Sequence, residues 1–250
     1  MPAALVTGSS RGIGRAVARR FARDGYDVAV NYASSAQKAR TVAERIEEET
    51  DSEAVAVRAD VGDAEAAADL VDATVEAFGG VAHVVNNAGV DQHVFTEDLS
   101  PADFDRVMDT NVNGAFNVTK AALPHLRDAA ESDDGPAPTP SVTNVSSILA
   151  HTGAPVECHY AASKSGILGL TKSHAADFAP DVRVNAVAPG HVETDMTADR
   201  TEAEKREELA EIPLGRFGQP EDIAEAVAYL RDAGFVTGET LEVNGGELMR

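Results

Sequence analysis

The sequence predicts an α/β fold built on a doubly wound parallel sheet of about seven strands. Short runs of β-branched and apolar residues alternate with longer stretches whose apolar residues recur at helical spacing. The short runs are apolar at consecutive positions, as expected of strands that helices cover on both faces of a parallel sheet. No linker rich in proline, glycine or serine divides the chain, so we expect one domain over residues 1–250.

The elements alternate from the first residues onward. The run Ala3–Thr7 predicts a buried strand, and Gly12–Arg23 then places Ile13, Val17 and Phe21 on one face of a helix. Further strands are expected at Asp27–Asn31, Ala54–Arg58, Ala82–Asn86, Ser141–Ser146, Val182–Val187 and Thr240–Val243. Further helices are expected at Ala36–Glu49, Ala64–Phe78, Pro101 to about Asp128, Cys158–Phe178 and Pro220–Leu230, with Ala129–Pro140 as a surface loop.

The charge of the chain excludes several classes of partner. The 250 residues carry 42 acidic and 21 basic side chains, a net charge of −21. A surface of this sign repels nucleic-acid phosphates and anionic lipids, so we expect neither a nucleic-acid partner nor a membrane anchor. No apolar run has the length of a membrane span, and the first residues lack the pattern of a secretory leader. The single cysteine, Cys158, cannot form an internal disulfide, which favours a cytoplasmic protein.

The basic residues are unevenly divided, with sixteen arginines and five lysines. Together with the acidic surplus, this favours a halophilic protein. At about 1 M salt the Debye length falls to roughly 3 Å, so repulsion between surface carboxylates is screened. The alternative is an acidic protein from an arginine-rich and alanine-rich genome.

A glycine-rich turn joins the first predicted strand to the first helix. Residues 7–14 read TGSSRGIG, with glycines at Gly8, Gly12 and Gly14. Glycines allow a tight turn, and the N-terminus of the following helix offers unpaired N–H groups to a pyrophosphate. The spacing GxxxGxG differs from the usual GxGxxG, so the evidence for a dinucleotide site is the position directly after the first strand.

A tyrosine and a lysine lie four residues apart on the predicted helix Cys158–Phe178. Tyr160 and Lys164 therefore share one helix face, one turn apart. A free tyrosine has a pKa near 10, and a cation within a few ångström favours the phenolate and lowers that pKa. Such a pair is suited to acid–base catalysis near neutral pH.

Four motifs in this order and spacing resemble the short-chain dehydrogenase/reductase family. They are TGSSRGIG at 7–14, NNAG at 86–89, YAASK at 160–164 and Pro189–Gly190, and the resemblance covers residues 3 to 249. It implies a Rossmann-like fold, a nicotinamide cofactor and an oxidoreductase that needs no metal. The seven histidines fit that expectation, because none shows a ligand spacing such as HxxxH.

The resemblance also implies the catalytic residues. Tyr160 is expected to donate a proton to the substrate carbonyl during reduction, and Lys164 to lower the pKa of Tyr160 and hold the nicotinamide ribose. Ser147 matches the serine that hydrogen-bonds the carbonyl, although Ser146 is adjacent and only spacing separates the two. Asn111 matches the asparagine that positions a water in the proton relay, and asparagine is a poor residue for the interior of a helix.

The cofactor expected is NADP(H). The second strand ends at residues 30–34 without the carboxylate that would hold an NAD ribose, while Arg11 offers a guanidinium to a 2′-phosphate. Arg11 as a solvated turn charge is the alternative, and Asp60 has the alternative of capping the next helix. The resemblance implies cofactor contacts from Gly8, Ser10, Arg11, Gly12, Ile13, Gly14, Asn31, Tyr32, Asp60, Val61, Asn87, Ala88, Gly89, Tyr160, Lys164, Pro189, Gly190, Val192 and Thr194.

Within the family, the sequence is most similar to 3-oxoacyl-thioester reductases of fatty-acid or polyhydroxyalkanoate metabolism. Segments 190–197, 212–222 and 237–246 carry this similarity, but the last two also occur in sugar and alcohol dehydrogenases. We therefore expect NADPH-dependent reduction of a small-molecule 3-oxoacyl thioester. One alternative is an enzyme acting on a sugar, polyol or other small ketone, and another is a non-catalytic cofactor-binding regulator.

The sequence leaves open whether the acyl group is carried by coenzyme A or by acyl carrier protein. Acidic stretches at 131–134 and 177–181 replace the basic residues with which such reductases meet an acidic acyl carrier protein, so coenzyme A is at least as good a carrier. Residues 191–212 are expected to form a substrate lid. The family resemblance implies a homotetramer, and the closing segment 243–249 is weakly charged, as suits an interface.

Overall fold

The computed structural model describes residues 2–131, 139–194 and 201–249. Its strands are β1 Ala3–Val6, β2 Asp27–Tyr32, β3 Ala54–Arg58, β4 His83–Asn86, β5 Ser141–Val145, β6 Arg183–Pro189 and β7 Thr240–Val243. Its helices are α1 Gly12–Arg23, α2 Ala36–Glu49, α3 Ala64–Phe78, α4 Pro101–Met108, a π-helical turn η1 Asp109–Asn113, α5 Gly114–Glu131, α6 Leu149–Thr152, α7 Cys158–Phe178, α8 Glu202–Glu211 and α9 Pro220–Asp232.

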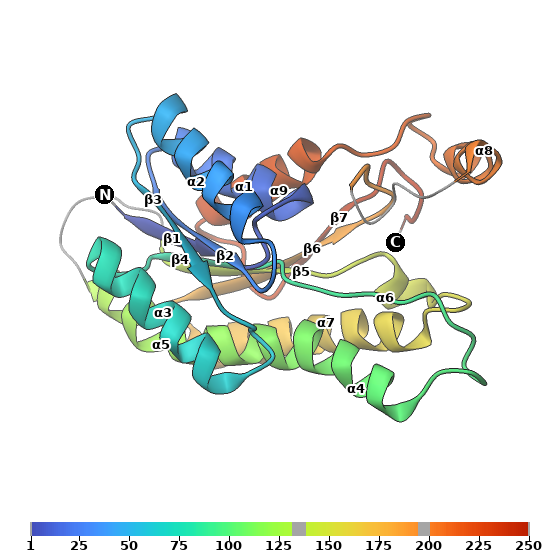
Figure 1. The fold of residues 1–250 in the computed structure, drawn as a ribbon, viewed down its shortest axis with the longest axis horizontal. Coiled ribbons are helices and arrows are strands. Elements are labelled where there is room, and N and C mark those ends of the chain that lie inside the picture. The colour runs from blue at the N-terminus through green and yellow to red at the C-terminus, as the bar shows by residue number, and fades with distance from the viewer. Residues whose placement is uncertain (1, 132–138, 195–200, 250) are drawn as a thin grey trace.

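All seven strands form one parallel sheet, which confirms the predicted fold class. The strand order is β3-β2-β1-β4-β5-β6-β7, and every neighbouring pair runs parallel (Figure 1). The order reverses between β1 and β4, since the chain first builds outward to β3 and then returns to the other side of β1. In open sheets of this kind, ligands bind beyond the carboxyl ends of the strands at such a reversal.

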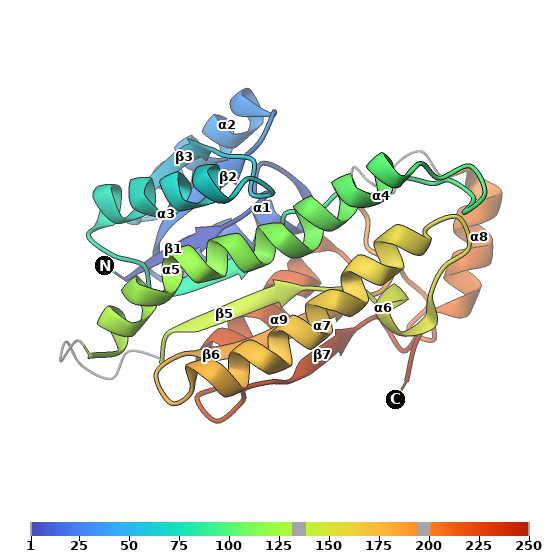
Figure 2. The same ribbon diagram turned by 90° about the horizontal axis from the view of Figure 1, so that it is seen from below.

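Helices cover both faces of the sheet, which explains why the strands are apolar at consecutive positions. Ala4 and Val6 of β1 pack against α1, α2 and α9, whereas Leu5 between them packs against α3, α5 and α7. Figures 1 and 2 show these two helical layers on opposite sides of the sheet. Side chains of a strand alternate between the faces, so each face buries its own apolar set.

A buried polar network ties α5 and α7 to the middle of the sheet. The amide of Asn86 on β4 donates to Thr119 Oγ1 on α5 and to Asn144 Oδ1 on β5, each at 2.9 Å. Asn144 in turn donates to Thr171 Oγ1 on α7 at 2.9 Å. The network fixes the rotation of α7, the helix that carries Tyr160, relative to the strand ends.

The long helix expected from Pro101 to about Asp128 is divided, so that prediction was wrong in its interior. It begins at Pro101, widens into the π-helical turn at 109–113 and ends as α5 at Glu131. Such turns insert an extra residue into a helix and are frequent at functional sites. Here the turn contains Asn111, whose side chain bonds to a neighbouring loop instead of lying along the helix.

Other expected boundaries differ from the observed ones by one to three residues. β1 ends at Val6, β4 begins at His83, and β6 extends to Pro189. The predicted loop at 129–140 begins later, since α5 continues to Glu131, and its residues 132–138 lie outside the described part of the chain. No helix in the described ranges is both long enough and apolar enough to pass through a membrane.

We predict that Asn144→Ala lowers the free energy of unfolding by about 3 kcal/mol. The Asn144 amide is buried, and it accepts a hydrogen bond from Asn86 and donates one to Thr171, so its removal leaves both partners without a bond they make in the wild type. Urea unfolding measures the loss. Asn113→Ala is the matched control, since that amide bonds only to exposed Asp109, and it should cost less than about 0.5 kcal/mol. Equal losses in the two variants would contradict a structural role for the network.

Candidate active site

The glycine turn lies at the reversal point of the sheet and has no room for a side chain at Gly8 or Gly14. Gly8 and Gly12 have φ of 60° and 54°, a region that favours glycine. A Cβ on Gly8 would lie 2.8 Å from Cα of Ala88, and one on Gly14 would lie 2.5 Å from Nδ2 of Asn87. The first turn of α1 has no acidic residue, and Arg11 at its N-cap makes no capping bond with its side chain. This end of α1 is therefore suited to an anion such as a pyrophosphate.

Hydrogen bonds hold the turn in place from both sides. Asn87 Nδ2 donates to the carbonyl oxygens of Thr7 at 2.9 Å and Gly8 at 3.1 Å. Thr7 Oγ1 accepts from the backbone N–H of Ala88 at 2.9 Å. Asn31, at the end of β2, accepts from Gly8 N–H at 3.0 Å. The expected contact residues Asn31 and Asn87 thus form the frame of the cofactor turn.

A basic cavity of about 430 Å³ adjoins the turn. It is lined by Ser10, Arg11, Arg15, Arg19, Gln37, Lys38, Thr41, Val42 and Arg45. Five of these nine residues are basic, in a chain whose net charge is −21. Of these five basic residues, only Arg11 was identified from the sequence, although arginine recurs every fourth residue from 11 to 19, which places all three on one side of the first turns of α1.

Three other expected cofactor residues lie at the end of β2 or just after β3. Tyr32 is half-buried at the end of β2. Asp60 is exposed and accepts from Gly62 N–H at 3.1 Å, while Val61 is buried. The helix that follows is capped by Asp63, whose carboxylate accepts from Glu65 and Ala66 N–H, so the alternative that Asp60 caps it was wrong.

The expected catalytic residues meet where β5 ends and α7 begins. Lys164 is buried, and its Nζ donates to the carbonyl oxygen of Val145 at 2.8 Å and lies 5.5 Å from the ring centroid of Tyr160. Ser147 forms a side-chain hydrogen bond with Tyr160. Ser146 instead donates to the carbonyl oxygen of Lys164 at 2.9 Å. The two serines therefore differ, and Ser147 is the one that faces the tyrosine.

Asn111 fastens the segment after β4 to α7. Its Oδ1 accepts from Val90 N–H at 2.8 Å, and its Nδ2 donates to Val90 O at 3.0 Å and to Ser163 Oγ at 2.9 Å. A Cβ on Gly89 would lie 3.3 Å from Asn111 Oδ1 and 3.4 Å from Lys164 Nζ. Asn111, Gly89 and Lys164 are thus brought together, and the Asn111 amide is occupied by protein groups.

The electrostatics of the pair differ from the expectation. Burial lowers the pKa of Lys164 to about 8, and the carboxylate of Asp91 opposes this change. The pKa of Tyr160 is raised, first by burial and then by the carboxylates of Asp91 and Glu157, with the Ser147 hydrogen bond opposing the rise. The charges of the polypeptide therefore favour the neutral phenol, whereas the sequence predicted that Lys164 would favour the phenolate.

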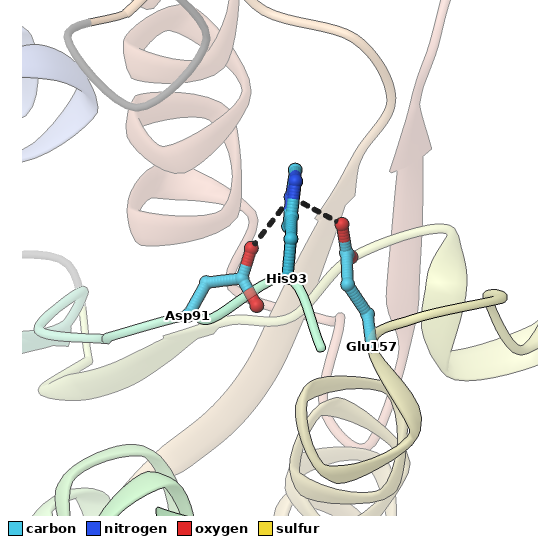
Figure 3. Close-up of side chains that lie close together, drawn as sticks. All are labelled: Asp91, His93 and Glu157. Carbon is cyan, nitrogen blue, oxygen red and sulfur yellow. Dashed lines mark ion pairs between the residues drawn. The ribbon is translucent and has the colours of Figure 1, made fainter. Parts of the chain in front are cut away.

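Sequence reasoning missed one cluster beside this pair, composed of Asp91, His93 and Glu157. In the described part of the chain it is the one group of three such side chains whose potential metal-ligand atoms all lie within 4.8 Å of one another. Figure 3 shows the imidazole of His93 between the two carboxylates. Sixty-odd residues separate Asp91 from Glu157, so no local spacing could have revealed it.

The segment after β6 passes over the glycine turn. The carbonyl oxygen of Pro189 accepts from Ile148 N–H at 3.0 Å, next to Ser147, and Gly190 N–H donates to Val243 O at 3.1 Å. Val192 is buried. A Cβ on Gly12 would lie 3.6 Å from the side chain of Thr194, so Thr194 closes over the turn.

Comparisons with known proteins agree with this architecture. The family model described as enoyl-(acyl carrier protein) reductase matches residues 8–247. A 3-oxoacyl-(acyl-carrier-protein) reductase, FabG, of Staphylococcus aureus strain Mu50 is 40% identical over 249 residues, which are 98% of each chain. Glucose 1-dehydrogenase 2 of Bacillus subtilis strain 168 is 39% identical over 248 residues, 97% of this chain and 93% of that one.

Solved structures give the same result. A short-chain dehydrogenase/reductase of the glucose/ribitol dehydrogenase type from Brucella melitensis superposes with a TM-score of 0.91 at 32% identity, covering 100% of this chain and 97% of that one. A dehydrogenase/reductase from Sinorhizobium meliloti 1021 has a TM-score of 0.90 at 37% identity, covering 99% and 95%. With its parallel sheet, glycine turn and Tyr160–Lys164 pair, the chain belongs to the short-chain dehydrogenase/reductase family of nicotinamide-dependent oxidoreductases.

Proposed function

We propose that the protein catalyses the NADPH-dependent reduction of a 3-oxoacyl thioester to the 3-hydroxyacyl thioester. The observation that carries the proposal is that Ser147, Tyr160 and Lys164 lie together. Ser147 follows the carboxyl end of β5, and Tyr160 and Lys164 belong to the first turns of α7. An intact acid–base group of this kind also argues against a non-catalytic regulator.

The residues around the glycine turn fit a nicotinamide dinucleotide. The turn excludes side chains where a Cβ would collide with Ala88 or Asn87, and the N-terminus of α1 faces the same side. The basic cavity supports NADP(H) over NAD(H), because Arg11, Arg15 and Lys38 line it, and residues 30–34 at the end of β2 include no carboxylate. The remaining cofactor contacts proposed are those that the family resemblance implies, including Asp60, Thr194 and Lys164.

In the proposed reaction, the bound cofactor supplies the hydride. Tyr160 donates its phenolic proton to the carbonyl oxygen as that oxygen becomes a hydroxyl, and takes a proton back in the reverse direction. Ser147 holds the carbonyl oxygen by a hydrogen bond. Lys164 and Asn111 keep the ribose side of the site and the segment after β4 in place.

The thioester is supported by the FabG relatives, whose name states that they reduce 3-oxoacyl groups on acyl carrier protein. For this chain we favour a coenzyme A thioester, because its surface is strongly acidic and acyl carrier protein is an acidic partner. In a coenzyme A thioester, the phosphates of the coenzyme also lie far from the carbonyl, at the other end of a neutral arm. This separation matters where Asp91 and Glu157 lie beside Tyr160.

A sugar or polyol is the second candidate substrate, and the cluster of Asp91, His93 and Glu157 favours it. Carboxylates near the reacting carbon would accept hydrogen bonds from neighbouring hydroxyls. The relative named glucose 1-dehydrogenase 2 supports the same reading.

We further propose that residues 191–212 form a lid, that the enzyme works as a cytoplasmic homotetramer and that it tolerates molar salt. His191 Nδ1 lies 2.8 Å from Glu247 Oε1, so the beginning of this segment contacts the C-terminal residues. His191 Nε2 lies 3.8 Å from Glu208 Oε1 on α8, near the other end of the segment. Residues 195–200 of this segment lie outside the described part of the chain.

Tyr160→Phe should lower kcat by about 10²–10⁴-fold, since the phenolic proton donor is lost. The Kd for NADPH, measured by fluorescence titration, should change less than about threefold. Turnover at the wild-type rate would contradict the mechanism. Tyr229→Phe, on the exposed face of α9, is the control and should leave both quantities unchanged.

Arg11→Ala should raise KM for NADPH by about 10–100-fold, the value of one charge-assisted hydrogen bond to the 2′-phosphate. KM for NADH should change less than about threefold. Arg23→Ala removes an arginine from the last turn of the same helix and is the control. Equal effects on the two cofactors would mean that Arg11 does not hold the phosphate.

The choice between substrates rests on one assay, the oxidation of NADPH with acetoacetyl-CoA against the oxidation of glucose and polyols with NADP⁺, in low salt and in about 2 M KCl. We expect kcat/KM for the thioester to exceed that for any sugar by at least about 100-fold. A sugar preferred by that margin would replace the thioester by the second candidate.

A further inference from the structure

Three ionisable side chains lie together next to the N-terminal end of α7, outside the catalytic group described above. His93 Nε2 lies 2.6 Å from Glu157 Oε1 and 3.4 Å from Asp91 Oδ2 (Figure 3). Asp91 and His93 come from the segment after β4, and Glu157 is the N-cap residue of α7. The cluster therefore bridges two separate segments at the beginning of the helix that carries Tyr160.

The backbone holds these two segments together independently of the three side chains. Val94 N–H donates to Val156 O at 2.7 Å. Asn111 bonds both the N–H and the carbonyl of Val90. Val156 has a φ of 60°, the strained left-handed region for a β-branched residue, and it directs the chain into Glu157. Replacing a side chain of the cluster should thus change its charge and leave the path of the backbone intact.

The charges of the cluster act on the catalytic pair. Asp91 and Glu157 each disfavour the phenolate of Tyr160, and Asp91 favours the ammonium of Lys164. The side chains of Asp91 and Glu157 are only 12% and 15% exposed, so water and salt screen them less than surface carboxylates. The imidazole of His93 is 68% exposed and lies between the two carboxylates.

We propose that Asp91, Glu157 and His93 are positioning residues for the proton transfer at Tyr160. The two carboxylates keep the phenol in the protonated form that reduction requires, and His93 holds the two carboxylates in place by contacting both. The proposal rests on the function proposed above. In reduction the O–H bond of Tyr160 breaks as one forms on the substrate oxygen, and the resulting phenolate recovers its proton from solvent.

The charged and titratable groups that face Tyr160 come from three places. Asp91 lies on the segment after β4, Ser147 follows β5, and Glu157 and Lys164 belong to α7. Two other histidines near the site have carboxylate partners of their own. His151 pairs with Glu242 at 3.0 Å, and His191 pairs with Glu247 at 2.8 Å.

The test is the pH dependence of the reverse reaction, the oxidation of 3-hydroxybutyryl-CoA, which requires the phenolate and rises as Tyr160 loses its proton. Asp91→Asn and Glu157→Gln should each move this rise to lower pH by about one unit, because each removes a negative charge. His93→Gln leaves both carboxylates in place, and its amide can still donate to them, so the rise should stay within about 0.3 pH units of its wild-type position. Glu97→Gln, an exposed carboxylate of the same segment, is the control and should not move it.

A second measurement does not depend on the substrate. The chain has four tyrosines and no tryptophan, so the phenolate absorbance of Tyr160 can be isolated in the NADP⁺ complex by subtraction of Tyr160→Phe. The same pattern is expected: a shift to lower pH for the two carboxylate variants, and a change of less than about 0.3 pH units for His93→Gln. Rates that fall without any shift, or a His93→Gln shift in the direction of the carboxylate variants, would overturn the proposal. If no thioester is turned over but the absorbance shifts as expected, the substrate assignment fails and the roles of the three residues stand.

Discussion

The join between the end of β1 and the end of β4 is the constraint on which the rest of the site depends. Thr7 and Asn87 bond to each other's segments through side chain and backbone, and Asn31 supports the turn from β2. Because these bonds hold the turn against the segment after β4, Gly8 and Gly14 lie so close to Ala88 and Asn87 that no side chain fits at either glycine. A shift of one strand would open the turn and displace the N-terminus of α1, the anion site of the fold.

The catalytic group is arranged by burial as much as by charge. Lys164 is removed from water and bonds to a carbonyl oxygen, and Tyr160 is half-buried beside two carboxylates. Both effects favour neutral side chains, which suits the donation of a proton but not its removal. The reverse direction therefore needs positive charge from elsewhere, and the oxidised nicotinamide ring of the proposed cofactor would supply it.

The sequence pattern predicted the sheet because each strand must bury both of its faces. Leu5 packs on one face of the sheet and its neighbours Ala4 and Val6 on the other, so β1 does not alternate between polar and apolar residues. The pattern did not predict the turn at 109–113, whose cause is a tertiary bond from Asn111 to Val90. In the site, motifs found residues that are close in sequence. Asp91 and Glu157 escaped because only the fold joins them, and Arg15 escaped although helical spacing already placed it beside Arg11.

The distribution of charge constrains what can approach the site. Five basic residues line the cavity beside the glycine turn, whereas the carboxylates of Asp91 and Glu157 lie near Tyr160. An anionic group next to the reacting carbonyl would meet Asp91 and Glu157 in a poorly screened environment, at a cost of several kcal/mol. A substrate must therefore present a neutral end to Tyr160 and keep any phosphates remote from it. A long neutral arm between phosphate and carbonyl satisfies this condition, and so does an uncharged polyol. A short phosphorylated ketone does not.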